Sequence, residues 1–443
     1  MHISQQLAAL AVGQVLAGHN LTSTLDQIFK DYGDITPQQR AVTQDLSYGS
    51  LRYYGQLQAL LTQLLQKPLQ DKRAHNLLLV ALYQLMHDKA APHTVVDQAV
   101  GAAAQLKKPW AKGLVNAVLR NFLRQREALI KTLVADEVAT YSYPQWWITL
   151  IKQQYPENWQ NILEAGNQHP PMTLRVNQRL SNIANYSQRL SAQGLQFCAI
   201  GSSAIMLEKP LPVDKLPGFY EGEVSVQDYG AQLAAKLLSL EDGQRVLDAC
   251  CAPGGKTSHI LESAKVRLLA IDNDAKRLQR VQSNLERLNL SAELAVTNAD
   301  NTNKWWDGVP FDRILADVPC TASGVVRRHV DIKWLRRHAD IASFASQQAR
   351  ILHGLWPLLA KGGKLLYVTC SVFQEENQLQ IDQFLKNHAD ARQIQIDFAA
   401  LLTDVSKPTE QYQLTLKHPA LGQLLPCREH DGFFYALLEK SAV

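Results

Sequence analysis

The 443-residue sequence lacks several patterns that would assign it to common protein classes. Its six cysteines include no Cys-x-x-Cys pair, which argues against a zinc site and against thioredoxin-like chemistry. The most apolar stretch, Leu77 to Leu82, is far too short to span a bilayer. The N-terminus shows no basic segment followed by an apolar core, so no secretory signal is expected. We therefore expect a cytoplasmic protein with no membrane partner and no metal.

The net charge is small, but it is unevenly distributed. The chain holds 45 lysines and arginines against 41 aspartates and glutamates, a formal excess of +4. Residues 1–140 contain 14 of the basic and 10 of the acidic residues, so the remaining 31 of each cancel. The excess thus lies in the first third, as expected of a region that meets a polyanion. A solvated basic face with no partner explains it equally well.

At this length two or three domains are expected, and residues 1–140 read as an all-helical one. Apolar residues recur at helical spacing from Ile3 to Leu16 and from Leu57 to Leu65. Thr36 and Pro37 have the residue types of a helix N-cap and first turn. The segment from His75 to Met86 is almost wholly apolar, which predicts a central helix of a bundle.

Basic residues surround Trp110 in this first domain. If the domain binds RNA, they would contact phosphates while the indole ring stacks on a base. For Trp110 itself the favoured alternative is a core position beside a solvated basic face. The candidate RNA-binding residues of this region are Lys107, Lys108, Lys112, Arg120, Arg124 and Arg126.

Residues 141–222 are expected to form a small α+β domain that binds RNA or links its neighbours. The aromatic run from Tyr143 to Trp147 interrupts the helical pattern, and Thr173 to Asn177 alternates as a strand does. A helix near Ile183 to Gln193 and a strand near Gln196 to Ala199 complete the unit. Arg175 and Asn177 share one face of the first strand, so a contact with RNA is possible there.

Residues 223–443 alternate strand, loop and helix, which predicts a Rossmann-like domain with a mainly parallel sheet. Arg245 to Ala249 is the first such strand, and a tight loop from Cys250 to Lys256 follows it. The second strand ends at Asp272, and Asp300 lies just beyond the third.

The loop and these aspartates indicate a site for an adenosine-like ligand. Adjacent glycines let a ligand approach the backbone, and an acid that ends the next strand can bind a ribose diol. The loop is neither a G-x-G-x-x-G cradle nor a P-loop, so the ligand need not carry phosphates. S-adenosylmethionine fits, with Asp300 at the adenine amino group. The candidate cofactor-binding residues are Cys250, Cys251, Ala252, Pro253, Gly254, Gly255, Lys256, Asp272, Asp300 and Asp317.

Two cysteines follow two further strands. Cys320 ends the sequence Asp-Val-Pro-Cys, which begins at Asp317 after a strand from Phe311 to Ala316. Cys370 follows a strand from Lys364 to Val368. If these strands are neighbours, both thiols face one crevice at the carboxyl edge of the sheet.

Several motifs together resemble the RsmB/NOP family of RNA 5-methylcytosine methyltransferases. They are Asp248 to Lys256, Asp317 to Cys320, Arg327 to Leu335, Thr369 to Ser371 and Asp431 to Tyr435. Leu114 to Arg120 resembles NusB, an all-helical RNA-binding domain that this family carries at its N-terminus. The sequence departs from the family pattern at Cys251 and Val318, where alanine is usual, which puts local packing and cofactor affinity in doubt.

The resemblance implies a function and a role for each site residue. Cys370 would be the nucleophile that adds to carbon 6 of cytosine, and Cys320 would assist proton removal and release. Asp317 would hydrogen-bond the cytosine edge, and Lys256 would hold the cytosine or a nearby acid. The implied cofactor is S-adenosyl-L-methionine. The implied partner and substrate is 16S ribosomal RNA, methylated at carbon 5 of one cytosine, position 967. Composition suggests no obligate protein partner, so a monomer is expected.

A second basic segment follows the Asp-Val-Pro-Cys motif. RNA would pass there if its target base is extruded into the pocket. A basic capping helix paired with Asp331 and Asp340 is the alternative. The candidate RNA-binding residues of this segment are Arg327, Arg328, Lys333, Arg336 and Arg337.

Other functions remain open on the sequence. An enzyme that methylates exocyclic amino groups carries a similar acid-proline motif but needs no thiol, so Cys370 would be dispensable. A NusB-like factor with an inactive methyltransferase fold would act in transcription or ribosome assembly. A NAD-dependent oxidoreductase is disfavoured because the glycine fingerprint is absent.

Overall fold

The computed structural model describes residues 2–87, 90–105, 110–398, 401 and 422–442. The chain divides into two compact units. The first comprises residues 1–168 and 326–338, and the second comprises residues 169–325 and 339–443. Three domains bounded near residues 140 and 222 were expected, whereas the structure groups the helices up to residue 168 with the first unit. No helix of the described ranges is long and apolar enough to cross a membrane.

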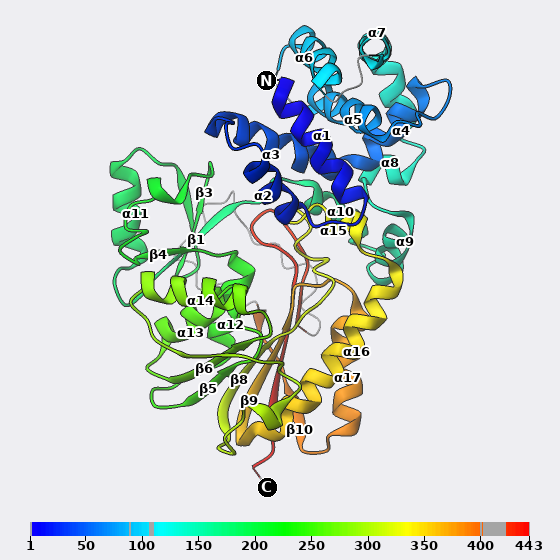
Figure 1. The fold of residues 1–443 in the computed structure, drawn as a ribbon. Helices are drawn as coiled ribbons and strands as arrows, with labels where there is room; N and C mark the ends of the chain where they lie inside the picture. Colours follow the sequence, from blue (N-terminus) through cyan, green and yellow to red (C-terminus); the bar gives the residue numbers. More distant parts are fainter. Residues whose placement is uncertain (1, 88–89, 106–109, 399–400, 402–421, 443) are drawn as a thin grey trace. The chain divides into compact units, whose positions relative to one another are not determined.

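The first unit is helical (Figure 1). Its elements are α1 (His2–Leu16), α2 (Leu21–Asp31), α3 (Pro37–Arg52), α4 (Tyr54–Leu64), α5 (Lys72–His87), α6 (Pro92–Gln105), α7 (Ala111–Leu133), α8 (Glu137–Tyr141), α9 (Gln145–Gln154), α10 (Trp159–Asn167) and α15 (Ile332–Leu335). Every residue from Leu77 to Leu82 on α5 is fully buried, as expected for a central helix. Thr36 forms a capping box with Gln39 and thereby begins α3 where the sequence indicated.

The segment 326–338 belongs to the first unit although it lies within the sequence of the second. The Lys333 ammonium donates to the carbonyl of Arg52 and to Oδ1 of Asn167, at 2.7 Å each. Asp331 Oδ2 accepts the backbone N–H of Leu21 at 2.9 Å. The indole of Trp334 donates to the carbonyl of Leu51 at 2.8 Å. These bonds fix the segment, with α15 beside α10 (Figure 1).

The second unit contains two sheets. The smaller has the order β2-β3-β1-β4 with antiparallel neighbours, and α11 (Ile183–Ala192) packs into its apolar core. Its strands are β1 (Met172–Val176), β2 (Phe197–Ile200), β3 (Ala204–Leu207) and β4 (Val224–Val226). The single turn η1 (Val213–Lys215) precedes β4.

The larger sheet has the order β10-β12-β9-β8-β5-β6-β7, with β11 paired to β12. Neighbours from β9 to β7 are parallel, whereas β12 runs antiparallel to both β9 and β10. The strands are β5 (Arg245–Asp248), β6 (Arg267–Asp272), β7 (Glu293–Val296), β8 (Phe311–Asp317), β9 (Leu359–Thr369), β10 (Ala391–Ile394), β11 (Gln423–Leu424) and β12 (Phe433–Lys440).

Helices cover both faces of this sheet, as the alternating sequence pattern predicts. One apolar core contains residues of α12 (Tyr229–Leu237), α13 (Gly255–Ser263) and α14 (Ala275–Arg287). The other contains residues of α16 (His338–Leu355) and α17 (Gln378–Asn387). The short turns η2 (Thr302–Lys304), η3 (Trp356–Leu358) and η4 (Gln374–Glu376) connect these elements. The prediction of a Rossmann-like domain is confirmed.

Candidate active site

The strand order of the larger sheet reverses between β5 and β8. From β5 the chain proceeds outward through β6 to β7, and then returns to β8 on the other side of β5. Ligands of open α/β sheets bind at such a reversal, beyond the carboxyl ends of the strands. Asp248 ends β5 and Asp317 ends β8, so both acids lie at this point.

The loop after β5 is held in a turn that requires glycine. Gly254 has φ +98°, and a Cβ there would lie 3.2 Å from the Val281 backbone. The carbonyl of Ala252 accepts a bond from the Arg277 guanidinium at 2.7 Å. The hydroxyl of Thr257, in the first turn of α13, donates to Asp248 Oδ2 at 2.7 Å. The predicted cofactor loop is therefore anchored on both sides.

Arg175 supports this loop from β1. Its guanidinium is fully buried and forms an ion pair with Glu262 at 2.7 Å. It also donates to the Gly255 carbonyl at 2.8 Å and to the Ser258 hydroxyl at 3.0 Å. An RNA contact by Arg175 was considered possible from the sequence. The structure contradicts that interpretation, because this guanidinium has no exposed surface and bonds α13 to the smaller sheet.

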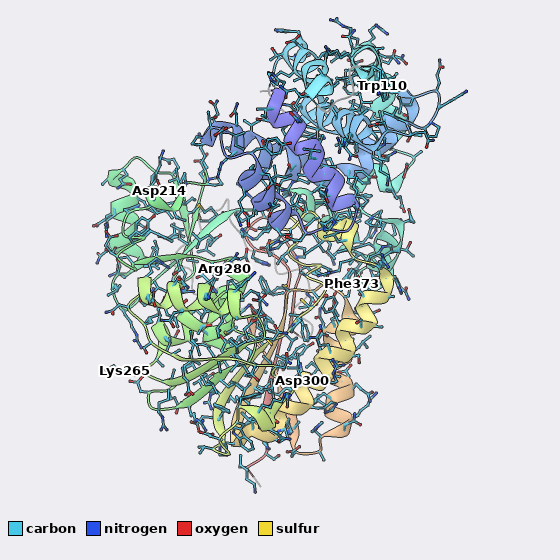
Figure 2. All side chains as sticks on the ribbon, viewed as in Figure 1. Trp110, Asp214, Lys265, Arg280, Asp300 and Phe373 are labelled. Carbon is cyan, nitrogen blue, oxygen red and sulfur yellow. The ribbon has the colours of Figure 1, made fainter. Side chains whose placement is uncertain are left out.

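The two aspartates predicted to bind adenosine differ in their surroundings. Asp272 is buried and accepts the backbone N–H groups of Ala252 and Asp274, at 3.2 and 3.0 Å. Oδ2 also lies 3.5 Å from the Arg277 guanidinium, whereas Oδ1 can accept a second bond, so the ribose diol role is compatible with this geometry. Asp300 (Figure 2) is partly exposed, and its carboxylate lies 3.6 Å from the Arg350 guanidinium of α16. Its adenine contact stays a prediction.

Lys256 and Asp317 form an ion pair across the strand reversal. The ammonium lies 2.6 Å from Asp317 Oδ2, and both side chains are mostly buried. Burial disfavours the charge of Lys256, but attraction to Asp317 outweighs it and raises the pKa of the ammonium. The negative charge of a Cys370 thiolate would raise the pKa of Lys256 further. Lys256 therefore carries its charge at the place where a carboxylate and a thiol meet.

The two predicted thiols do meet. β8 and β9 are parallel neighbours, and the backbone N–H of Val318 donates to the carbonyl of Val368 at 3.1 Å. This pairing brings Cys320 Sγ to 3.4 Å from Cys370 Sγ. Cys320 is buried, whereas Cys370 is partly exposed. The hydrogen bond to Cys370 and burial raise the pKa of the Cys320 thiol well above its ordinary value, so Cys320 is protonated near neutral pH.

Glu376 is hydrogen-bonded to the loops that follow Cys320 and Cys370, and its role is not evident from the sequence. Its carboxylate is buried and accepts the backbone N–H of Thr321 at 2.8 Å and the side-chain amide of Gln348 at 3.1 Å. The hydroxyls of Thr321 and Ser371, which follow the two cysteines, both donate to Oε2. Burial raises the pKa of Glu376 despite these bonds. A hydroxyl residue directly after each cysteine was the available signal for such an acid.

The residues that follow Cys370 form the single turn η4 before α17 starts at Gln378. Asn377 separates η4 from α17. Its side chain does not cap α17, because it is bonded to residues next to Cys370. Its amide donates to the carbonyl of Ser371 at 2.9 Å, and its Oδ1 accepts the Thr369 hydroxyl at 2.6 Å. The residues around Cys370 are thus fixed by side-chain bonds rather than by a helix terminus.

The other cysteines lack such a setting. Cys250 and Cys251 follow β5, and burial raises the pKa of each thiol, so both stay protonated. Among the described residues, no group of three or more histidine, cysteine, aspartate and glutamate side chains is arranged to hold a metal ion.

The basic candidates fall into exposed and buried groups. Lys112, Arg120 and Arg124 are exposed on α7, whereas Lys107 and Lys108 lie outside the described residues. Trp110 is 57% exposed, so the favoured reading of it as a core residue is wrong.

In the segment 326–338 the prediction fails for two residues. Arg327 and Lys333 are 1% and 0% exposed, so neither offers a charged group to a phosphate. Burial lowers the pKa of Lys333 well below its ordinary value, and its amine is bonded within the first unit. Arg328 and Arg336 are half-buried, and Arg337 is exposed.

Comparison with known proteins agrees with this arrangement. The family model described as 16S rRNA methyltransferase RsmB/F matches residues 235–439, an RsmF/B-like ferredoxin-like domain matches 143–214, and the NusB family matches 2–124. Ribosomal RNA small subunit methyltransferase B of Pseudomonas syringae is 45% identical over 99% of this chain and 96% of that protein. This chain belongs to the RsmB/F methyltransferase family.

Solved structures show the same fold. The match to the crystal structure of PH0851 covers 99% of this chain and 99% of that chain, with a TM-score of 0.76 at 22% identity. A methyltransferase homologue from Pyrococcus horikoshii covers 69% of this chain and 98% of its own, with a TM-score of 0.58 at 27% identity. The cofactor of the family is S-adenosyl-L-methionine. The residues at the strand reversal fit this cofactor. Gly254 has no side chain to block the backbone of the loop, and the acids that end β6 and β8 lie around the same loop.

Proposed function

We propose that this protein methylates carbon 5 of a cytosine in 16S ribosomal RNA by covalent catalysis through Cys370. The proposal rests chiefly on the 3.4 Å separation of the Cys320 and Cys370 sulfurs beside the Lys256–Asp317 ion pair. The family resemblance supplies the RNA and the expected target, cytosine 967. Methylation of an exocyclic amine would leave this pair of thiols without a role.

Carbon 5 of cytosine is too electron-poor to attack a methyl donor directly. A thiolate that adds to carbon 6 converts the ring to an enamine, whose carbon 5 is nucleophilic. S-adenosyl-L-methionine, when bound, supplies an electrophilic methyl group. The carbon 5 proton must then leave, and its electron pair re-forms the double bond as the sulfur is expelled from carbon 6.

The two cysteines divide these tasks. Cys370 is the more accessible sulfur, and the Cys320 thiol beside it has a raised pKa and stays protonated, so we assign the addition to carbon 6 to Cys370. Once Cys370 is bonded to carbon, Cys320 loses its partner and can release its proton to solvent. The resulting thiolate accepts the carbon 5 proton, and Cys370 departs as a thiolate.

Asp317 and Lys256 act at the polar edge of the base. The Asp317 carboxylate has one oxygen on the Lys256 ammonium, and its other oxygen is available to accept the N4 amino group of cytosine. A proton on N3 neutralises the negative charge that the thiolate brings into the ring, and the Lys256–Asp317 pair would stabilise that protonated state. Glu376 and Arg175 act through the loops that they position and do not touch the substrate.

The cofactor-binding residues are proposed to be the loop from Cys250 to Lys256 with Asp272, Asp300 and Asp317. Exposed cations on α7, namely Lys112, Arg120 and Arg124, would contact the ribosomal RNA backbone. Arg328, Arg336 and Arg337 are further candidates at the second basic segment. We propose a cytoplasmic protein that acts as a monomer.

The test uses Cys320→Ala and Cys370→Ala proteins with unmodified 16S ribosomal RNA and S-adenosyl-L-methionine. The Cys320→Ala protein should accumulate a covalent protein–RNA band on a denaturing gel, because addition proceeds and release fails. The Cys370→Ala protein should give neither the band nor 5-methylcytosine. Cys198→Ala, which removes a half-buried thiol of the smaller sheet, is the matched control and should behave as wild type. Normal methylation by Cys370→Ala would overturn the proposal, and N4-methylcytosine in the product would identify the amine reaction instead.

A further inference from the structure

A cavity of about 740 Å³ opens on the first unit. It lies between the loop that follows α4, residues 64–71, and the N-terminal half of α7. The volume falls within the roughly 300–1,000 Å³ of typical small-molecule sites. No part of the proposed reaction uses this cavity.

The lining of the cavity is mixed: it contains leucines, the amide side chains of Gln66, Gln70 and Asn121, and two cations. Leu64, Leu69 and Leu114 are partly buried along its sides. At the rim, the charged groups of Lys67 and Arg124 are exposed to solvent. The leucines can contact an apolar ring, the amides can hydrogen-bond its polar edge, and the cations can bind negative charge beside it.

The acidic group at the cavity does not cancel this charge. Asp71 is the acid among the described lining residues, and its carboxylate caps α5. Oδ1 accepts the backbone N–H groups of Arg73 and Ala74 at 3.0 Å each. A carboxylate at a helix N-terminus is compensated by the helix dipole. The rim thus presents net positive charge, as does the exposed face of α7 with Lys112 and Arg120.

Trp110 completes the arrangement at the mouth. It precedes α7, lines the cavity and keeps 57% of its surface exposed (Figure 2). A large aromatic ring left at the surface beside cations is the arrangement by which proteins bind unpaired nucleic acid bases. Every base has a stacking face, so such a site tolerates different sequences.

We propose that this cavity binds an unstacked base of single-stranded RNA. The base stacks on the indole of Trp110 and enters between Leu69 and Leu114, while Arg124 and Lys67 contact the flanking phosphates. The site is separate from the one that takes the target cytosine. It would hold a second, unpaired nucleotide of the same RNA and would require neither S-adenosyl-L-methionine nor Cys370.

The first experiment measures binding of fluorescent oligouridine and oligoadenosine, about ten nucleotides long, to the full-length protein without cofactor. Loss of one base–aromatic stack weakens binding by roughly 5- to 150-fold. The Kd of Trp110→Ala should therefore exceed the wild-type Kd by a factor in that range. Trp110→Phe should restore most of the affinity. Arg124→Ala should weaken binding and reduce its salt dependence.

Matched controls come from the same helix or its end. Val134→Ala removes an apolar side chain that is 78% exposed and does not line the cavity. Lys131→Ala removes an exposed cation of α7 that is likewise outside the lining. Both proteins should bind as wild type. A fully paired RNA duplex of the same length should compete poorly with the single strand.

A second readout locates the contact. RNA with 5-iodouridine, irradiated on the full-length protein, should crosslink to the peptide that contains Trp110. The crosslink should disappear in Trp110→Ala and persist in Val134→Ala. The proposal fails if crosslinks map only to other peptides or if Trp110→Ala binds both oligonucleotides with wild-type affinity. The Cys370→Ala protein should crosslink normally, so failure of the proposed methylation chemistry would leave this result intact.

Discussion

Cys320 Sγ lies 3.4 Å from Cys370 Sγ, although 50 residues separate the two in the sequence. The contact arises because β8 and β9 are parallel neighbours, so the loops that follow them leave the sheet at the same edge. The contact with Cys370 and burial raise the pKa of Cys320 well above its ordinary value, while Cys370 is the more exposed of the two sulfurs. The relationship gives the thiols different roles before any substrate binds.

Release of the covalent RNA adduct should accelerate as pH rises. In the free protein, contact with Cys370 and burial raise the pKa of Cys320 well above its ordinary value; in the adduct, where Cys370 is bonded to carbon, burial still disfavours the thiolate, so Cys320 is protonated near neutral pH. If its thiolate removes the carbon 5 proton, the release rate should rise about tenfold per pH unit while Cys320 remains mostly protonated. Single-turnover decay of the adduct between about pH 6.5 and 9 measures this rate. The same slope in Cys320→Ala would assign the proton transfer to another base.

Removing the Lys256 charge should slow methylation strongly without unfolding the protein. Lys256→Met deletes the ammonium that lies 2.6 Å from Asp317, and the charge at the polar edge of the base is then uncompensated. We expect kcat to fall by about 10²- to 10⁴-fold, the usual range for a group that assists proton transfer. Lys265→Met, at an exposed position of the same unit (Figure 2), is the control and should retain activity. Methylation within a factor of about two of wild type would show that the ion pair is structural.

Glu376→Ala should destabilise the second unit strongly. The substitution leaves the buried Thr321 N–H without its acceptor and removes one acceptor each from the Gln348 amide and the Ser371 hydroxyl, so we expect a loss of about 3–5 kcal/mol in the free energy of unfolding. Glu376→Gln keeps the shape and one acceptor, so its loss should be near 1 kcal/mol. Denaturant titration measures both. Glu375→Ala, one residue earlier and only half-buried, is the comparison, and an equal loss there would refute the role of the buried carboxylate.

Asp248 should make the protein less stable as pH rises towards neutrality. Burial raises the pKa of Asp248 to about 7 from an ordinary 3.8. Between these values the folded state binds a proton that the unfolded state does not, so the free energy of unfolding falls as pH increases. The shift corresponds to at most about 4 kcal/mol. Asp248→Asn can still accept the Thr257 hydroxyl and has no such proton, so its Tm advantage over wild type should grow between about pH 4 and 7. Parallel Tm curves would contradict the assignment.

Much of the second unit could be predicted from local sequence. The strand from Phe311 and the one that ends before Cys370 carry apolar runs, and their neighbouring positions in the sheet follow from the preference for parallel crossovers. The contact of the two thiols therefore followed from topology. The partners of Arg175 did not, because a strand pattern shows which face a side chain occupies but not what covers that face.

The burial of Lys333 was unpredictable for a similar reason. Five basic residues within eleven positions resemble a solvated or RNA-binding face, and only the folded chain shows that Lys333 reaches the carbonyl of Arg52, 281 positions away. Glu376 was overlooked because a hydroxyl residue after each cysteine indicates a nearby acceptor but not which acid supplies it, and no spacing rule links the two distant loops. Polar networks of this kind depend on tertiary packing, which hydrophobic periodicity does not encode.

The excursion of residues 326–338 gives the chain three crossings between its units, at positions 168/169, 325/326 and 338/339. A protease cut at any one of them gives two fragments that both contribute residues to one unit, so packing within that unit should keep them together after a single nick. A fragment that starts at residue 169 would also carry Val330, Trp334 and Leu335 without the helices against which they pack. Gene truncation at the apparent domain boundary should therefore yield an aggregation-prone catalytic half, whereas replacing 326–338 by a short polar linker should restore its solubility.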